Sequence, residues 1–264
     1  MLVATVNAWA LKLLPDGVSI ALREKLTLQR PLDYEQAEIA LRITSRTEKD
    51  VRLRSCEKEP ETVDWIQQTL QPGDVLYDIG ANSGAYSLVA ASWTRGQATV
   101  YAFEPGYTTF PNLVENIFIN NCHEAVIPFQ VALGARTALT RFDYSTLEPG
   151  GATHGGIVGD QASPGHVRMQ SLVCYRLDDF VSLLQLRSPT HLKIDVDGSE
   201  LAVLQGAATT LMSSSVRWVL VEVDGTTREA LEVREFLEAC GFTLAEDHAH
   251  QGGTTHNWIF RSAR

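Results

Sequence analysis

An apolar segment that ends in a glycine turn carries the clearest chemical signal in this sequence. Residues 75–84 read VLYDIGANSG. A strand that breaks into a glycine turn and then opens a helix presents backbone N–H groups to a nucleotide-like ligand. A second apolar segment, 99–103, is followed by Glu104, and an acid at the tip of the second strand can hold both hydroxyls of a ribose. The sequence therefore predicts a site for a ligand that contains ribose.

The spacing of the turn distinguishes between two such ligands. A dinucleotide fingerprint reads G-x-G-x-x-G, which lets the backbone close on a pyrophosphate. Here the glycines are Gly80 and Gly84, Asn82 stands where a middle glycine would be, and Asp78 precedes the turn. The carboxylate of Asp78 would repel a pyrophosphate but attract the ammonium group of an amino acid, which the amide of Asn82 can also reach. This combination predicts S-adenosylmethionine, with a plain turn at a buried strand end as the alternative reading.

A second group of acids follows later in the chain. Residues 193–200 read KIDVDGSE, which places Asp195 and Asp197 two positions apart at the end of a predicted strand, and Glu222 stands near the end of the next one. Because ligands bind beyond the carboxyl ends of parallel strands, we expect these three acids to converge beside the methyl donor. They could take the proton of an acceptor hydroxyl, or hold a Mg²⁺ ion that acidifies it. His154, in a glycine-rich loop, is a further candidate base.

Strands and helices alternate around these groups, which is the pattern of a parallel sheet with right-handed crossovers. A final helix precedes two more strands, so the sequence predicts an α/β fold with a Rossmann-like, seven-stranded, mostly parallel sheet whose last strand is antiparallel. Strands are expected at 75–79, 99–103, 126–133, 191–196, 216–223, 242–246 and 257–261. A glycine-rich loop inside the segment 139–175 interrupts the alternation and is interpreted as a substrate loop, with disorder as the alternative.

The bulk properties limit the classes of protein to consider. The 264 residues, 44% of them hydrophobic, are enough for one large domain, which we place at 57–264 behind an N-terminal extension at 1–56 that contains a helix and a hairpin centred on residues 48–50. A formal charge of −10 argues against a nucleic-acid partner. Four cysteines without C-x-x-C spacing indicate neither zinc nor disulfides, as in a cytoplasmic protein. The apolar segment 2–14 is too short to span a membrane.

Both motifs together resemble the FkbM family of S-adenosylmethionine-dependent methyltransferases. The matching pieces are DIGANSG at 78–84, FEP at 103–105 with Asn116 and Asn120–Asn121, KIDVDGSE at 193–200 with Leu204 and Gly206, and VEV at 221–223. The family usually has Glu where this chain has Asp197, a shorter carboxylate of the same charge. The resemblance implies a seven-strand methyltransferase fold and methyl transfer, commonly to a hydroxyl of a saccharide, a polyketide or a related natural product.

The resulting hypothesis is an O-methyltransferase that acts on a small-molecule or glycan acceptor. The expected donor-binding residues are Asp78, Gly80, Asn82 and Gly84 for the methionine part, Glu104 for the ribose and Ala132 for the adenine. The expected catalytic residues are Asp195, Asp197, Glu222 and His154. Two alternatives stay open: a non-catalytic regulatory protein that binds S-adenosylmethionine, and a nicotinamide-dependent oxidoreductase, which the missing middle glycine and the lack of a Tyr-x-x-x-Lys pair disfavour. Methylation of nitrogen in place of oxygen also stays open.

Overall fold

A seven-stranded sheet forms the centre of the computed structural model, which describes residues 14–25, 28–144, 146–151, 157–158, 168–250 and 252–264. The strand order is β12-β13-β11-β10-β3-β4-β5. The strands are β3 (Val75–Ile79), β4 (Thr99–Phe103), β5 (Val126–Phe129), β10 (His191–Ile194), β11 (Trp218–Asp224), β12 (Phe242–Ala249) and β13 (Thr255–Ser262). Strand β13 runs antiparallel to both β11 and β12, and the other neighbours are parallel. The predicted fold class is confirmed.

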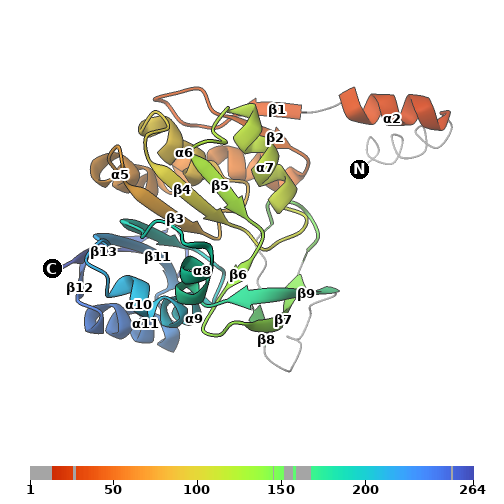
Figure 1. The fold of residues 1–264 in the computed structure, drawn as a ribbon. Coiled ribbons are helices and arrows are strands. Elements are labelled where there is room, and N and C mark those ends of the chain that lie inside the picture. Colours follow the sequence, from red (N-terminus) through yellow and green to blue (C-terminus); the bar gives the residue numbers. More distant parts are fainter. Residues whose placement is uncertain (1–13, 26–27, 145, 152–156, 159–167, 251) are drawn as a thin grey trace.

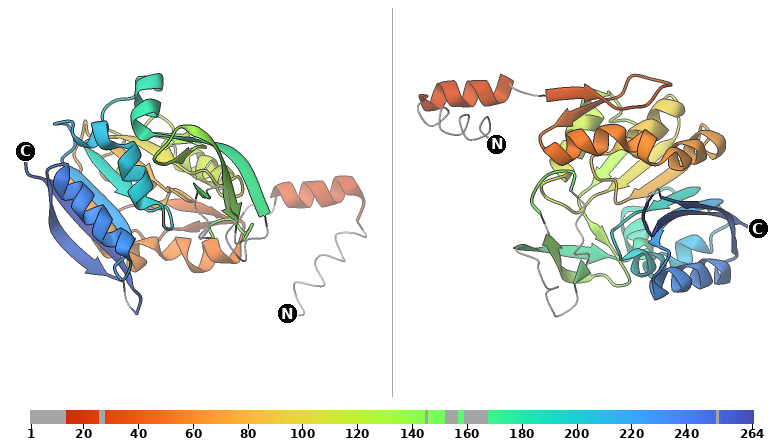
Figure 2. Two further views of the ribbon diagram at one scale, coloured as in Figure 1. Left: turned by 90° about the horizontal axis from the view of Figure 1, so that it is seen from below. Right: turned by 180° about the vertical axis from the view of Figure 1, so that it is seen from behind.

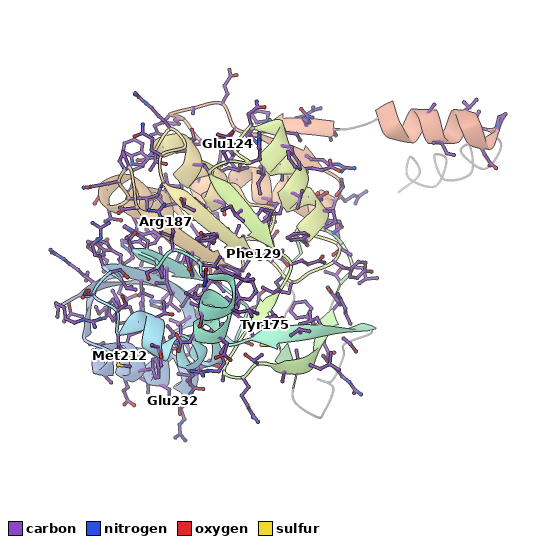
Figure 3. All side chains as sticks on the ribbon, viewed as in Figure 1. Glu124, Phe129, Tyr175, Arg187, Met212 and Glu232 are labelled. Carbon is purple, nitrogen blue, oxygen red and sulfur yellow. The ribbon has the colours of Figure 1, made fainter. Side chains whose placement is uncertain are left out.

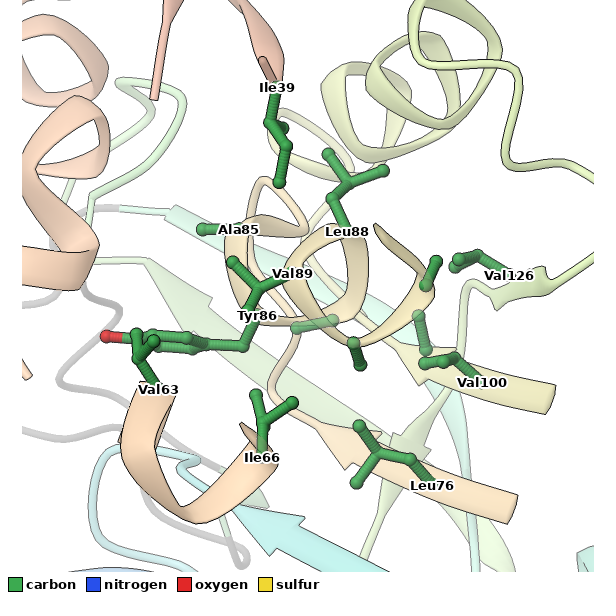
Figure 4. Packing of buried hydrophobic residues seen from close by; sticks show 14 of the residues in the cluster. Ile39, Val63, Ile66, Leu76, Ala85, Tyr86, Leu88, Val89, Val100 and Val126 are labelled. Atoms are coloured by element: carbon green, nitrogen blue, oxygen red, sulfur yellow. The ribbon is translucent and has the colours of Figure 1, made fainter. Parts of the chain in front are cut away.

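Helices cover both faces of this sheet (Figure 1 and Figure 2). One layer contains α5 (Pro60–Thr69), α6 (Ala85–Trp93) and α7 (Phe110–Ile119), and the other contains α8 (Leu177–Leu184), α9 (Glu200–Gly206), α10 (Ala208–Leu211) and α11 (Arg228–Ala239). Because side chains alternate along a strand, Leu76 packs into the first layer and Tyr77 into the second. Figure 4 shows the buried hydrophobic residues between the sheet and the first helix layer, where the hydroxyl of Tyr86 points away from the aliphatic side chains. Within the described ranges, every helix is too short or too polar to cross a bilayer.

A small second sheet replaces the end of the strand expected at 126–133. The chain leaves the large sheet after Phe129, and β6 (Ala132–Leu133) joins β9 (Arg168–Tyr175), β7 (Ala138–Tyr144) and β8 (Ile157–Val158) in the order β6-β9-β7-β8. Phe129 and Tyr175 lie where the two sheets meet (Figure 3), and the ring of each is 5.1 Å from that of Phe180 on α8. This aromatic contact anchors the small sheet to the body of the molecule.

The N-terminal extension contains a hairpin, but not where the sequence predicts it. Strands β1 (Leu28–Pro31) and β2 (Ala40–Ile43) pair antiparallel, and the expected turn at 48–50 belongs to α3 (Arg46–Asp50), followed by η1 (Arg52–Arg54) and α4 (Ser55–Lys58). The physical reason is a capping box: the Oγ of Ser45 accepts from the N–H of Glu48, 2.9 Å away, and Glu48 accepts from the N–H of Ser45, 3.2 Å away. Helix α2 (Asp16–Lys25) lies apart from the body of the molecule (Figure 1).

The extension packs onto the sheet domain through its backbone. Asn116 of α7 and Asn120, which caps the C-terminal end of that helix, accept hydrogen bonds from the N–H groups of Arg42 and Ala40, at 2.7 and 2.9 Å. Leu41 belongs to the same hydrophobic cluster as α5 and α6. The division into 1–56 and 57–264 stays a prediction.

Candidate active site

The loop after β3 touches the loop after β10, and a glycine makes this approach possible. Gly80 has φ +84°, and a Cβ atom there would lie 1.7 Å from the backbone oxygen of Asp195. The N–H groups of Gly80 and Ala81 both donate to the carbonyl of Phe103, each at 2.9 Å. Any larger residue at position 80 would push the two loops apart, so the glycine holds together the ends of β3, β4 and β10.

A cavity of about 120 Å³ lies where these strands end. It brings together most of the residues that the sequence predicts for the site: Gly80, Asn82, Glu104, Asp195, Asp197 and Glu222. Arg52 of η1 and Gly151 of the glycine-rich loop also line it, and the Nε of Arg52 donates to the carbonyl of Gly150 at 2.8 Å. The N-terminal extension and the described start of the glycine-rich loop therefore cover the same cavity. His154 lies outside the described residues.

A smaller apolar pocket adjoins this cavity. It has a volume of about 30 Å³ and is lined by Phe103, Ala132 and Leu133, among others. The two spaces share four lining residues, namely Gly80, Pro105, Phe142 and Val196. Ala132 is thus placed beside the polar cavity, at the start of the small sheet and not on the third strand of the large one.

Asp78 and Gly84 lie behind the glycine turn and do not line the cavity. Asp78 follows Leu76 toward the face that α6 covers, because side chains alternate along β3. Its carboxylate is 1% exposed and accepts a hydrogen bond from the Oγ of Ser87 at 2.6 Å. Gly84, with φ +88°, caps α6, and a Cβ there would lie 2.6 Å from Leu113. Asp78 and Gly84 therefore lie behind the turn, and the expected direct contact between Asp78 and a donor ammonium group stays a prediction.

Lys193 is a site residue that the sequence analysis missed. Its side chain is 2% exposed, and its Nζ donates to Asp195 at 3.0 Å and lies 3.9 Å from Asp78. The ring centroid of Tyr86 is 5.1 Å away. Burial opposes the charge, but the carboxylates of Asp195 and Asp78 outweigh it and raise the pKa of Lys193. The available signal was a lysine inside the apolar strand β10, which pairs with Asp78 in the parallel register.

The acids at the cavity differ in protonation. Burial and then the charges of Asp195 and Glu59 raise the pKa of Glu222 to about 8. Burial also acts against the charge of Asp195, but Lys193 overcomes it and lowers the pKa of Asp195 below its usual value. Near neutral pH, Asp195 is therefore ionised while Glu222 carries a proton.

Glu104 closes the loop at the end of β4. Its two carboxylate oxygens accept from the N–H groups of Asn82, at 3.0 Å, and Gly106, at 2.7 Å. Burial raises the pKa of Glu104 to about 7, although both hydrogen bonds act in the opposite direction.

Asp197 also lines the cavity, from a left-handed turn with φ +56°. Strand β10 ends at Ile194 and not at the expected residue 196, so Asp195 and Asp197 both lie in the loop that follows it.

A metal ion would find its ligands elsewhere than predicted. Among the described residues, the one group of three or more candidate metal ligands is Glu59, Glu222 and His250, whose ligand atoms lie within 4.8 Å of one another. Asp195 and Asp197 are not part of it, so the Mg²⁺ alternative, in which Asp195, Asp197 and Glu222 hold the ion together, is not supported by the described residues. The Nζ of Lys58 already donates to Glu59 at 2.7 Å, and this cation competes with any ion there.

Comparisons with known proteins agree with the geometry. The model of the methyltransferase FkbM domain matches residues 78–244. Hexuronic acid methyltransferase AglP of Haloferax volcanii is 27% identical over 197 residues, covering 74% of this chain and 75% of that protein. The 31-O-demethyl-FK506 methyltransferase FkbM of Streptomyces tacrolimicus is 28% identical over 203 residues, with coverages of 67% and 76%. The crystal structure of methyltransferase FkbM from Methylobacillus flagellatus is similar in fold, with TM-score 0.53 and 15% identity over 73% of this chain and 44% of that longer one.

Proposed function

Since the chain belongs to the FkbM methyltransferase family, we propose that it transfers a methyl group from S-adenosylmethionine to a hydroxyl of a small-molecule or glycan acceptor. The observation that carries the proposal is the cavity in which Gly80, Asn82 and Glu104 meet Asp195 and Glu222. In this cavity, residues suited to bind the ribose of a methyl donor lie beside acids that can accept a proton. The names of the two relatives support the acceptor class, since one concerns a hexuronic acid and the other an O-demethyl compound.

The described residues fit this donor. Glu104 is positioned to accept the ribose hydroxyls, because its carboxylate is held at the end of β4 by two backbone N–H groups. The apolar lining beside Ala132, which includes Phe103 and Leu133, would contact the adenine. Gly80 and Asn82 line the remaining cavity and would hold the methionine part. We assign Asp78 and Gly84 a positioning role, through Ser87 and α6.

S-adenosylmethionine supplies a methyl group on a positively charged sulfur, and the protein has to orient the acceptor and take its proton. Glu222 is the best-placed base, since it lines the cavity and its pKa of about 8 makes it a stronger proton acceptor than an ordinary carboxylate. Asp195 stays ionised beside Lys193 and maintains the high pKa of Glu222. Asp197 lines the same cavity and would orient the acceptor, and His154 stays a candidate base in the glycine-rich loop.

Calorimetry with S-adenosylhomocysteine and with NAD tests the proposal. We expect the first to bind and the second not to bind. Glu104→Gln should weaken S-adenosylhomocysteine about tenfold or more, since it removes a charged hydrogen-bond acceptor. Glu124→Gln is the matched control, because Glu124 is exposed and lines neither the cavity nor its apolar neighbour. Binding of NAD with exclusion of S-adenosylhomocysteine would overturn the donor assignment, and donor binding without transfer to any hydroxyl compound would favour the regulatory alternative.

A further inference from the structure

A second cavity of about 700 Å³, which we call the groove, adjoins the candidate active site. It lies between the N-terminal helices and the end of β12, and Asp50, Val51, Arg54, Asp247 and His250 are among its lining residues. Lys58 lines both the groove and the smaller cavity. The two spaces therefore meet at the end of α4.

The junction between the two spaces carries the proposed base. Glu222 lines the 120 Å³ cavity of the candidate active site, and His250 lines the groove. The His250 Nε2 lies 3.9 Å from a carboxylate oxygen of Glu222. The same nitrogen is 3.5 Å from the carboxylate of Glu61, which the side chain of Asn257 holds with a hydrogen bond of 2.7 Å. A hydroxyl group that enters from the groove would thus meet Glu222 beside the methyl donor.

The charges in the groove restrict what can bind there. Its described lining includes four acids, Asp50, Glu57, Glu61 and Asp247, against the cations of Arg54 and Lys58. Both cations are already paired, Arg54 with Glu57 at 2.8 Å and Lys58 with Glu59 at 2.7 Å. Two of the acids have partners outside the lining, Asp50 with Lys49 at 3.2 Å and Asp247 with the Nδ1 of His256 at 2.6 Å. An acceptor with a carboxylate or phosphate would find excess negative charge and no uncommitted cation among these residues.

The polarity of the groove restricts the acceptor further. Its apolar lining is limited, within the described residues, to Val51, Pro60 and Ala249, which do not form the continuous surface that a large apolar molecule needs. Carboxylates and imidazoles such as Asp247 and His248 alternate with these short apolar contacts. Hydroxyl groups can donate to the carboxylates, while the C–H faces of a sugar ring can lie against the small apolar side chains.

Building on the function proposed above, we propose that the groove is the acceptor site and that it selects sugar-like, hydroxyl-rich acceptors without negative charge. His250 lies at its inner end, where its Nε2 is 3.9 Å from a carboxylate oxygen of Glu222. This selectivity differs from the hexuronic acid named for one relative. The difference follows from the acids that surround the groove of this chain.

Saturation-transfer NMR on the full chain loaded with S-adenosylhomocysteine tests this inference. The probes are three methyl glycosides of equal size: the glucoside, the glucosaminide and the glucuronide. We expect a saturation-transfer signal for the glucoside and the glucosaminide, and a signal for the glucuronide that is weaker by about tenfold. Val51→Trp should narrow the groove and weaken the saturation-transfer signal of all three probes. Asp50→Lys reverses one charge at an exposed position and should raise the relative signal of the glucuronide.

Glu124→Lys is the matched control, since it makes the same kind of charge reversal at an exposed acid outside the groove. Its probe signals should equal those of the unaltered chain. Three results would each overturn the inference: no saturation-transfer signal for the glucoside and the glucosaminide, a stronger signal for the glucuronide than for these two, or unchanged signals in Val51→Trp. Calorimetry with S-adenosylhomocysteine separates the two levels: failure of that binding contradicts the proposed function, whereas donor binding with no glycoside signal contradicts the acceptor site alone.

Discussion

Replacing Lys193 by methionine tests the buried charges beneath the site. The substitution keeps most of the side-chain volume but removes the ammonium group that lies 3.0 Å from Asp195 and 3.9 Å from Asp78. Asp78 is then left as a carboxylate that is 1% exposed and whose Oδ1 accepts no hydrogen bond from the residues that the structure describes. The side chain of Asp195 is 24% exposed, so water can solvate its charge. The main penalty therefore falls on Asp78.

Removal of one partner from a buried ion pair costs about 3–5 kcal/mol, because the other charge stays buried. Since only one of the two carboxylates is fully buried, we expect Lys193→Met to lower the free energy of unfolding by about 3 kcal/mol. The pKa of Asp78 is already raised by burial, against the effect of Lys193, and loss of Lys193 raises it further. Protonation relieves a buried carboxylate, so the penalty is absent below the ordinary carboxyl pKa of about 4 and grows as pH rises through the raised value.

Urea denaturation at mildly acidic and mildly alkaline pH measures both the size and the sign of this effect. The loss should be larger at alkaline pH, and the double variant Lys193→Met with Asp78→Asn should recover a large part of it. Arg234→Met is the control, because Arg234 and Glu238 form an exposed pair at 2.9 Å whose loss costs about 0.3–0.5 kcal/mol. A loss below about 1 kcal/mol for Lys193→Met, or a loss independent of pH, would refute the reasoning.

Gly80→Ala should destabilise the fold by about 1–3 kcal/mol more than Gly73→Ala in urea denaturation, because both glycines have positive φ but only Gly80 meets another backbone; equal losses would contradict the close approach. In calorimetry, affinity for S-adenosylhomocysteine should rise as pH increases through about 7, where Glu104 ionises and accepts hydroxyl groups more strongly. Glu104→Gln should flatten that dependence, and a flat profile in the unaltered chain would count against the ribose contact. Methyl transfer should increase as pH rises through about 8, where Glu222 loses its proton. Glu222→Gln should lower the rate about 100-fold or more and remove this limb of the profile, whereas retention of both would exclude Glu222 as the base.

The large sheet could be predicted because its signals are local. Strands β3 and β4 have the bounds that the sequence predicts, since each is an apolar run bordered by turn residues. The site at their ends follows from topology, because parallel strands bring their carboxyl ends to one edge. That argument placed Glu104, Asp195 and Glu222 around one cavity. The helix α3 was also within reach of sequence reasoning, since Ser45 and Glu48 have the spacing of a capping box.

Other features depend on contacts between distant residues. The small sheet forms because β7 pairs with β9 across a long loop, and no local pattern separates β6 from β5. The direction in which Asp78 points follows from the alternation of side chains that starts at Leu76. Whether its carboxylate can contact a bound donor depends on whether α6 covers that face of the sheet. His250 reads as a loop residue until the β12–β13 pairing brings the end of β12 beside Glu61 and Glu222. Side-chain partners across the fold are therefore what the linear pattern could not supply.

The buried lysine explains why neighbouring acids of the same kind can have different tasks. Asp195 follows β10 and Glu222 lies near the end of β11, and both line the cavity, yet only Asp195 has Lys193 within hydrogen-bond distance. That contact keeps Asp195 ionised, and the charge of Asp195 then adds to burial in raising the pKa of Glu222. A neutral residue at position 193 would remove the charge that lowers the pKa of Asp195 and would reduce the distinction. The charge of Lys193 by itself lowers the pKa of Glu222, so the raised value of Glu222 comes from burial and from the carboxylates of Asp195 and Glu59.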